Sequence, residues 1–343
     1  MSLPDKYVAI DEEGFPLFGE VRVTDPLVGA ELLKNIRIHE NGAFVSELAG
    51  TQVFVEAFDE PYVVQQILKT DSEWKIQLPY FVEFKFNPTT FTVDEWDRFH
   101  GVAVNGVPFV LTRKAQAELF RIADEYDDDS ITLNGKKISV TPWMTSDPEI
   151  SKEQFWTKIY QTEEPRWELN QPAPALVDML PRLKISKSRV LVLGCGSGND
   201  AAFFAQAGHL VTAIDISPEA LQRARSKYGH LTNLTFIESD VFTLGQEYSG
   251  QFDVIFEHTC YCAIQPERRN ELVKTWRRLL SPGGHLLGVF FAMERRSAPP
   301  FGGTEWELRE RLKKYFHFIF WGRWHQSIQN RNGKELLVYA QMK

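Results

Sequence analysis

One segment, residues 189–217, constrains the fold of this 343-residue chain more than any other. It reads RVLVLGCGSGNDAAFFAQAGHLVTAIDIS: an aliphatic run, three alternating glycines, a run of small residues typical of a helix, and a second aliphatic run that ends at Asp215. Unbroken aliphatic runs are typical of parallel strands whose two faces are covered by helices. The order strand, glycine turn, helix, strand and acid predicts the first half of a doubly wound α/β sheet.

The glycines and the acid predict a ligand site at the edge of this sheet. Gly194, Gly196 and Gly198 let the backbone approach a ligand closely, because glycine has no Cβ. Asp215 ends the second strand, where an acid accepts hydrogen bonds from a ribose diol. A dinucleotide fingerprint needs its third glycine at the position of Asn199. The G-x-G-x-G spacing instead resembles that of S-adenosylmethionine (SAM) methyltransferases and predicts SAM as the cofactor; a plain helix-packing turn is the alternative.

Composition restricts the expected partners. The chain has 38 Lys and Arg against 46 Asp and Glu, a formal net charge of -8, and no basic cluster. We therefore expect a small-molecule substrate, and neither nucleic acid nor a membrane surface. No apolar run is long enough to span a bilayer, and the first residues lack the pattern of a signal peptide. An odd, sparse count of 3 cysteines favours a reducing compartment, so the cytoplasm is expected.

The chain is predicted to form two domains. Asn-Gly pairs at residues 41–42, 105–106 and 134–135 each separate strand-like runs, and this pair favours a type I′ hairpin turn with two positive φ angles. One amphipathic helix is expected over residues 113–124. These signals predict a small, mostly antiparallel, β-rich α+β domain in residues 1–145, to which the sequence assigns no role. Its linker contains two prolines.

Strands and helices alternate in the second domain, residues 146–343. Beyond the opening segment, helices are expected after Ser151 and Pro174 and at residues 218–228, 267–280 and 305–314, and strands at 234–238, 252–256, 285–291, 315–323 and 336–341. Pro282-Gly283-Gly284 is expected to be a turn, and the last two strands to form an antiparallel hairpin through Asn332-Gly333. This order predicts a seven-stranded methyltransferase sheet with one reversed strand.

Residues 151–343 resemble the thiopurine S-methyltransferase family, which includes bacterial chalcogen-detoxifying enzymes and plant halide and thiol methyltransferases. The resemblance depends on six motifs in the family's order: FWTKIYQTEEPRW, VLGCGSGND, AIDIS, ESDVF, FDVIFEHTCYCAIQPERR and APPF. It implies an enzyme that transfers a methyl group from SAM to a small soft nucleophile, which is a thiol, a halide or a chalcogen anion.

The resemblance also implies a set of cofactor-binding residues. They are Gly194, Gly196 and Gly198 in the loop, Asp215 on the ribose, Ile216 beside the adenine, and Asp240 and Val241 at the adenine edge. Trp156 and Trp167 complete the set, because they flank the segment that covers the cofactor in the family, called the covering segment below. Glu257 ends the fourth strand, at the edge where such sheets bind ligands, and is assigned to the same site. For Trp156 the alternative is a core position on an amphipathic helix.

Two residues are predicted to be catalytic. Arg269 corresponds to an arginine in the family's P-x-x-R stretch, where a guanidinium would orient an anionic nucleophile; the alternative is a surface ion pair. His258 stands where plant relatives carry tyrosine, and its imidazole would accept a proton from a thiol; the alternative is a histidine hydrogen-bonded in the wall. Cys260 and Cys262 lack the second ligand pair of a zinc site, so no metal is expected and both are assigned to the pocket lining.

Two other functions stay open at the level of sequence. Amino-group methyltransferases that act on nucleobases commonly carry [DNS]-P-P-[YFW] after the fourth strand, where this chain has EHTC. A non-catalytic protein that binds SAM as a regulatory signal would keep the same pocket motifs.

Overall fold

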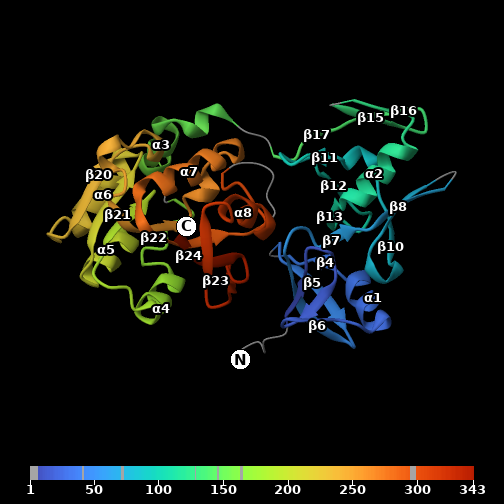
Figure 1. Cartoon of the computed structure of the whole chain (residues 1–343), viewed down its shortest axis with the longest axis horizontal. Helices are drawn as coiled ribbons and strands as arrows, with labels where there is room; N and C mark the ends of the chain where they lie inside the picture. Colours follow the sequence, from blue (N-terminus) through green and yellow to red (C-terminus); the bar gives the residue numbers. More distant parts are fainter. Residues whose placement is uncertain are drawn as a thin grey trace. The chain divides into compact units, whose positions relative to one another are not determined.

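The computed structural model describes residues 7–40, 42–70, 73–127, 129–144, 147–162, 165–293 and 299–343. The chain divides into two compact units (Figure 1). The first unit comprises Met1–Thr145 and Thr304–Glu307, and the second comprises Ser146–Gly303 and Leu308–Lys343. Among the described residues, no helix has both the length and the apolar character needed to cross a membrane.

The first unit consists of short strands around a core of its own. Its strands are β1 (Tyr7–Ile10), β2 (Pro16–Phe18), β3 (Val21–Arg22), β4 (Arg37–Ile38), β5 (Phe44–Leu48), β6 (Thr51–Ala57), β7 (Tyr62–Val64), β8 (Gln66–Lys69), β9 (Trp74–Gln77), β10 (Glu83–Lys85), β11 (Thr92–Val93), β12 (Phe99–Val102), β13 (Pro108–Leu111), β14 (Glu125–Tyr126), β15 (Ser130–Leu133), β16 (Lys136–Ser139) and β17 (Thr141–Pro142). They form sheets of six, five, three and three strands, and most neighbours are antiparallel. The parallel pairs are β1 with β6, β7 with β13, and β11 with β17.

The first unit has one more helix than predicted. The expected helix is present as α2 (Arg113–Ile122), but α1 (Pro26–Lys34) was missed. Its start signals are ordinary, because the Asp25 carboxylate accepts the N–H of Leu27 at 2.8 Å and Pro26 occupies the first turn. The nine-residue sequence PLVGAELLK is apolar on most sides, so it carries too little periodicity to indicate a helix.

The Asn-Gly turns differ from one another. Asn134 and Gly135 have φ angles of +54° and +70° between β15 and β16, as a type I′ turn requires. Between β12 and β13, Gly106 has a positive φ but Asn105 does not, so the type I′ prediction is wrong there. Asn105 instead donates its side-chain amide to the hydroxyl of Tyr62 at 2.9 Å. The remaining pair lies partly outside the described residues.

A seven-stranded sheet forms the second unit, in the order β20-β19-β18-β21-β22-β24-β23 (Figure 1). The strands are β18 (Arg189–Leu193), β19 (Leu210–Asp215), β20 (Leu234–Glu238), β21 (Phe252–His258), β22 (Leu280–Phe291), β23 (Phe316–Trp324) and β24 (Glu335–Met342). β24 runs antiparallel to both of its neighbours, whereas β18 to β22 are mutually parallel. This confirms the predicted doubly wound sheet with one reversed strand.

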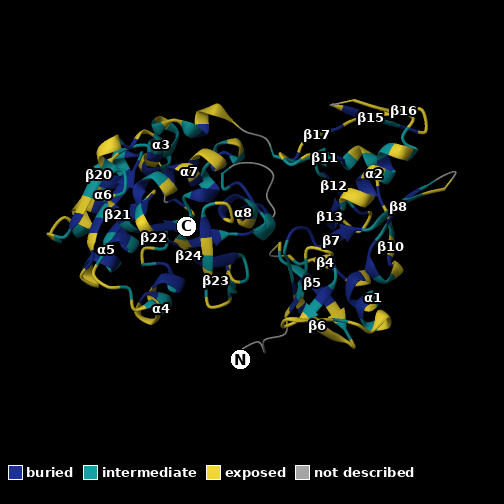
Figure 2. Cartoon of the chain, in the orientation of Figure 1, coloured by how far each residue is buried: buried dark blue, intermediate teal, exposed yellow. Residues whose placement is uncertain are grey.

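Helices cover both faces of this sheet. They are α3 (Glu153–Thr162), α4 (Pro174–Leu183), α5 (Asn199–Gln206), α6 (Pro218–Tyr228), α7 (Arg269–Leu279) and α8 (Glu305–Leu312), which belongs to this unit from Leu308 onward. Alternate residues of β18 enter two different cores: Val190 and Val192 pack in one, and Leu191 and Leu193 in the other. The central strands are consequently buried on both sides, as Figure 2 shows, which explains the unbroken aliphatic run.

β22 begins earlier than predicted. Pro282-Gly283-Gly284 was expected to be a turn before a strand at residue 285, but β22 extends from Leu280 to Phe291. The pairing with β21 shifts register within this stretch, because Phe252 pairs with Leu280 and Val254 pairs with His285. The strand therefore includes the Pro-Gly-Gly sequence as an irregularity instead of beginning after it.

Candidate active site

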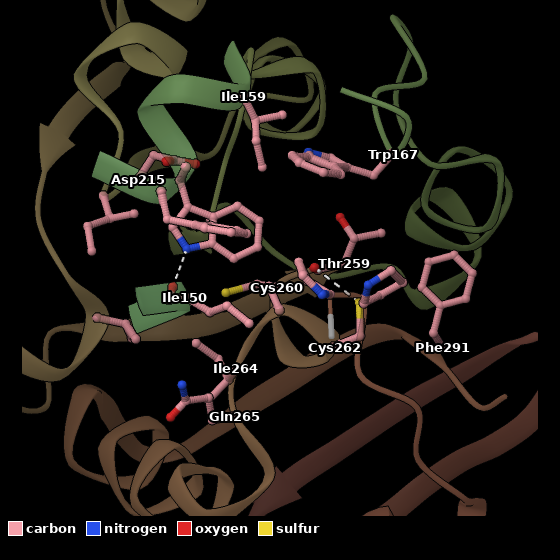
Figure 3. Close-up of a pocket in the computed structure, with 18 of the residues that line it drawn as sticks. Ile150, Ile159, Trp167, Asp215, Thr259, Cys260, Cys262, Ile264, Gln265 and Phe291 are labelled. Carbon is pink, nitrogen blue, oxygen red and sulfur yellow. Dashed lines mark hydrogen bonds between the residues drawn. The ribbon is translucent and has the colours of Figure 1, made fainter. Parts of the chain in front are cut away.

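A cavity of about 560 Å³ lies where the parallel strands of the second unit end (Figure 3). Seven of the predicted cofactor residues line it: Trp156, Trp167, Gly194, Asp215, Ile216, Asp240 and Val241. Gly196, Gly198 and Glu257 are not among the lining residues, and neither are the predicted catalytic residues His258 and Arg269. The structure thus brings most of the predicted cofactor site together around one cavity.

The glycine turn depends on glycine for conformation and for space. Gly194, Gly196 and Gly198 have φ angles of +51°, +52° and +81°, in the region that glycine adopts without strain. A Cβ added at Gly194 would lie 3.0 Å from the sulfur of Cys260, and one at Gly196 would lie 2.9 Å from the hydroxyl of Tyr160. Gly194 faces the cavity, while the other two glycines shape the turn behind it.

Asp215 connects the second strand to this turn. Its side chain is buried, and its two oxygens accept the N–H groups of Gly196 at 2.8 Å and Ser217 at 2.9 Å. Burial raises the pKa of Asp215. A carboxylate has about four lone-pair sites, so two backbone donors leave capacity for a ligand on the cavity side. A ribose contact by Asp215 remains a prediction that this geometry permits.

The segment that follows α3 is tied to the glycine turn. Glu168 accepts hydrogen bonds from the hydroxyl of Ser197 at 2.5 Å and from the amide of Asn199 at 2.7 Å. Trp156 and Trp167 meet edge to face, with ring centroids 5.7 Å apart. Trp156 also donates its indole N–H to the carbonyl of Ile150 at 2.8 Å. These contacts place two indole rings in the wall opposite the strand ends.

The lining fits SAM. Gly194 lines the cavity and has no side chain, so a ligand can approach its backbone closely. Ile216, Val241 and Phe242 supply an apolar wall suited to an adenine ring, and Asp215 supplies an acceptor suited to a ribose diol. The aromatic and sulfur-containing side chains on the remaining walls suit a methyl-bearing sulfonium.

His258 has both ring nitrogens engaged. Its Nδ1 lies 2.8 Å from a carboxylate oxygen of Asp200, and its Nε2 lies 3.1 Å from Nη1 of Arg331. Because a guanidinium can only donate, Nε2 is the acceptor and the proton on Nδ1 is donated to Asp200. His258 would reach an acceptor thiol only if Arg331 moved away, and its role as a base stays a prediction.

Arg269 is fully buried beneath the cavity wall. Its guanidinium lies over the ring of Tyr261 at 4.5 Å, and its Nη2 donates to the carbonyl of Phe301 at 3.5 Å. The alternative of a surface ion pair is therefore wrong. The neighbouring Arg268 lines the cavity, whereas Arg269 holds two parts of its wall together. Direct contact between Arg269 and a substrate remains a prediction.

Arg331 is a cavity-lining cation that the sequence analysis did not identify. It is 4% exposed, and its Nη2 donates to the carbonyl of Trp167 at 2.6 Å. Its guanidinium lies 5.1 Å from the ring centre of Phe291, and Nη1 lies 3.5 Å from the carboxylate of Glu335. Arg331 precedes the hairpin turn at residues 332–333, a position where no periodic pattern distinguishes a functional arginine from a surface one.

Glu257 at the end of β21 and Cys262 in the turn that follows are buried, and Cys260 between them is half-buried. Burial raises the pKa of Glu257 to about 7, and one of its oxygens accepts the N–H of Tyr261 at 2.6 Å. Burial also raises the pKa of Cys262 to about 12 and that of Cys260 well above its ordinary value. Both thiols therefore stay protonated near neutral pH. Within the described ranges, no group of three or more His, Cys, Asp and Glu side chains is placed to hold a metal ion.

Sheet, glycine turn, strand-end acid and cavity together define a SAM-dependent methyltransferase of the doubly wound class. The model of the thiopurine S-methyltransferase family matches residues 151–335, more than half of the chain. The chain therefore belongs to the thiopurine S-methyltransferase family, in which SAM is the methyl donor.

Similar proteins include two from Arabidopsis thaliana. A probable thiol methyltransferase 2 is 32% identical over 148 residues, which cover 42% of this chain and 65% of that protein. Thiocyanate methyltransferase 1 is 30% identical over 183 residues, which cover 52% of this chain and 80% of that protein. Among solved structures, a Burkholderia thailandensis 1,6-didemethyltoxoflavin-N1-methyltransferase with S-adenosylhomocysteine is 21% identical, with a TM-score of 0.46 over 64% of this chain and 99% of that one.

Proposed function

We propose that this protein transfers the methyl group of SAM to a small, soft, anionic nucleophile, which is a thiolate, a halide or a chalcogen anion. The observation that carries this proposal is the guanidinium of Arg331 in a cavity that also contains the glycine turn and Asp215. One cavity thus offers both a nucleoside-binding end and a cation for an anionic acceptor.

The rest of the lining supports an anionic acceptor. Arg166, Arg268 and Lys334 line the cavity as well as Arg331. Burial lowers the pKa of Lys334, whereas a guanidinium keeps its charge at any working pH. Arg331 therefore attracts the anion under all conditions of an assay. Methyl transfer removes the negative charge from the acceptor, so the product loses this attraction and can leave.

The chemistry demands positioning more than acid or base catalysis. SAM, when bound, supplies a methyl group already activated by its sulfonium. Trp156 and Trp167 would exclude water from that side of the cavity, which strengthens the field of Arg331. The glycine turn and Asp215 would fix the nucleoside, so that the anion meets the methyl group in line. A thiol acceptor must also lose a proton, and the role of base is assigned to His258 as a prediction.

The names of the relatives agree with this acceptor class. The two Arabidopsis proteins are named as thiol and thiocyanate methyltransferases, and a 25% identical protein of Xanthomonas campestris is named as a thiopurine S-methyltransferase. Each of these names refers to a sulfur nucleophile. We infer a soft nucleophile for this chain from that agreement together with the sulfur and aromatic lining of its own cavity.

The two alternatives have less support. A nucleobase methyltransferase would need a surface for a polyanion, but the net charge is -8 and the cations named above lie within the cavity. A purely regulatory SAM-binding protein would have no need of a buried arginine beside the cofactor site.

Turnover tests the proposal directly. Release of S-adenosylhomocysteine (SAH) should be measured with SAM and a panel of aliphatic and aromatic thiols, iodide, thiocyanate and hydrogen selenide. The reaction without acceptor and the reaction with an alcohol serve as controls. We expect release with at least one soft anion and none with the alcohol. Tight SAM binding without turnover on any member of the panel would instead support the regulatory alternative.

A further inference from the structure

Thr259 has a backbone conformation that its side chain disfavours. Its φ angle is +62°, in the left-handed region where a β-branched residue is a genuine outlier. The other non-glycine residues with positive φ in the described part of the chain are alanine, asparagine, aspartate, lysine, tyrosine and phenylalanine, so Thr259 is the β-branched member of that set. Strain of this kind persists where the surrounding structure enforces it, and it is concentrated at functional sites.

The surrounding turn enforces the angle but does not require threonine. β21 leads within three residues into a short 3₁₀ helix, Tyr261–Ala263. The carboxylate of Glu257 accepts the N–H of Tyr261 at 2.6 Å, and the thiol of Cys262 donates to the carbonyl of Thr259 at 3.3 Å. A glycine at position 259 would make the same turn without strain. The turn alone therefore does not explain the threonine side chain.

That side chain faces the cavity. Thr259 is a lining residue, and Figure 3 shows it between Trp167 on one side and Cys260 and Cys262 on the other. Its side chain has no hydrogen-bond partner among the residues that the structure describes. The hydroxyl is thus an unengaged donor beside the sulfur atoms of Cys260 and Cys262 and the indole ring of Trp167. It also adjoins the glycine turn, because Cys260 packs against Gly194.

We propose that Thr259 determines acceptor binding, by donating a hydrogen bond from its hydroxyl to the incoming anion. This inference rests on the proposed transfer to a soft anion and identifies a specific group that receives it. A single hydroxyl provides one directed contact, which suits a halide or a thiolate better than an extended organic anion. Arg331 supplies charge to the same cavity, and Thr259 supplies direction at the strand end where the methyl group would be presented.

Removal of the hydroxyl should weaken acceptor binding and leave cofactor binding unaffected. A hydrogen bond to a charged group is worth about 1.5–3 kcal/mol, so Thr259→Ala should raise KM for iodide and for a thiol by roughly tenfold or more. kcat and the Kd of SAM should stay near their wild-type values. Thr259→Ser keeps the donor and should restore KM to within about threefold. A purely structural role would not be rescued by serine in this way.

Two substitutions to glycine separate the effect of backbone strain from the effect of acceptor recognition. Thr259→Gly removes the strain and the hydroxyl together, so it should raise KM as the alanine variant does without lowering the melting temperature. Lys184 has a φ of +49° at the end of α4 and is not a cavity-lining residue. Lys184→Gly should therefore leave both KM values unchanged. Equal KM values in wild type and Thr259→Gly would overturn the inference.

A binding measurement distinguishes this inference from the proposed function. Calorimetry of thiocyanate with the SAH complex reports anion binding without turnover. We expect roughly tenfold weaker binding in Thr259→Ala than in wild type. Equal affinities would overturn the role of Thr259 even if the enzyme turns over. If the variant binds thiocyanate more weakly but the wild type transfers a methyl group to no acceptor, the contact between Thr259 and the anion is supported. The proposed reaction is then rejected.

Discussion

At the scale of single residues, Asp215 joins the sheet to the glycine turn, and its carboxylate is held in place before any ligand binds. Its oxygens accept the backbone N–H groups of Gly196 and Ser217, and its side chain faces the cavity. Loss of the carboxylate removes a predicted ribose contact as well as these two anchors. Asp215→Ala should weaken SAM binding at least about tenfold, because each charge-assisted hydrogen bond is worth about 1.5–3 kcal/mol. Calorimetry on a folded variant measures this, and an unchanged Kd would refute the assignment.

A second residue-scale prediction concerns Arg331 and His258. Arg331 donates to His258, whose other nitrogen donates to Asp200, so His258 positions the guanidinium in the cavity. Arg331→Ala should raise KM for iodide and thiol alike, and Arg331→Lys should rescue it only partly because lysine lacks the planar fork. If His258 acts only by positioning Arg331, His258→Ala should show a smaller rise in KM with both acceptors at every pH.

The pH profile separates positioning from base catalysis at His258. A base matters only when the acceptor must lose a proton, so iodide turnover would be unaffected by His258→Ala. The defect with a weakly acidic thiol would then shrink as pH rises, since the thiol ionises by itself. If the histidine variant shows that pattern, His258 is a base and the positioning role is wrong.

At the scale of elements, Glu168 ties the covering segment after α3 to the glycine turn. Glu168 receives hydrogen bonds from Ser197 and Asn199, which flank the end of the glycine turn. Glu168→Ala should release this segment and weaken SAM binding by roughly tenfold, because at least one hydrogen bond to a charged group is lost. Glu168→Gln keeps an acceptor oxygen and should have a smaller effect. Calorimetry on both variants tests this order of SAM affinities. Equal affinities in wild type, Glu168→Gln and Glu168→Ala would contradict it.

The elements also show which parts of the structure the sequence predicts. The order of strands and helices in the second unit was predictable because aliphatic runs and glycine turns are local signals. The glycine loop and Asp215 were predicted for the same reason, whereas the two tryptophans were predicted only from the resemblance to the family. Arg331 was missed because it reaches the cavity through tertiary folding from a loop near the end of the chain. α1 was missed because a short, largely apolar helix has little periodicity, and the strain at Thr259 has no signature in composition.

At the scale of the whole molecule, each unit has its own core, and a charge cluster is buried in the first one. His100 is 1% exposed, with Nδ1 at 3.0 Å from Glu60 and Nε2 at 3.1 Å from Asp94. Arg98 pairs with Asp94 at 2.8 Å as well. Burial lowers the pKa of His100, but the two carboxylates raise it by more, to about 9. The imidazole is therefore charged near neutral pH and holds both carboxylates.

The sign of this shift gives a pH dependence for one unit alone. An unfolded histidine has a pKa of about 6.5, so the contribution of His100 to stability is fully present below that pH and is lost as pH rises through about 9. Because the cores are separate, calorimetry should resolve two unfolding transitions, and the transition of the first unit should fall in temperature between pH 6.5 and 9. His100→Asn should lower that transition at pH 6.5 and make it nearly independent of pH in this range, while the other transition serves as the internal control. A wild-type transition that stays constant from pH 6.5 to 9 would show that His100 is not charged in the folded protein.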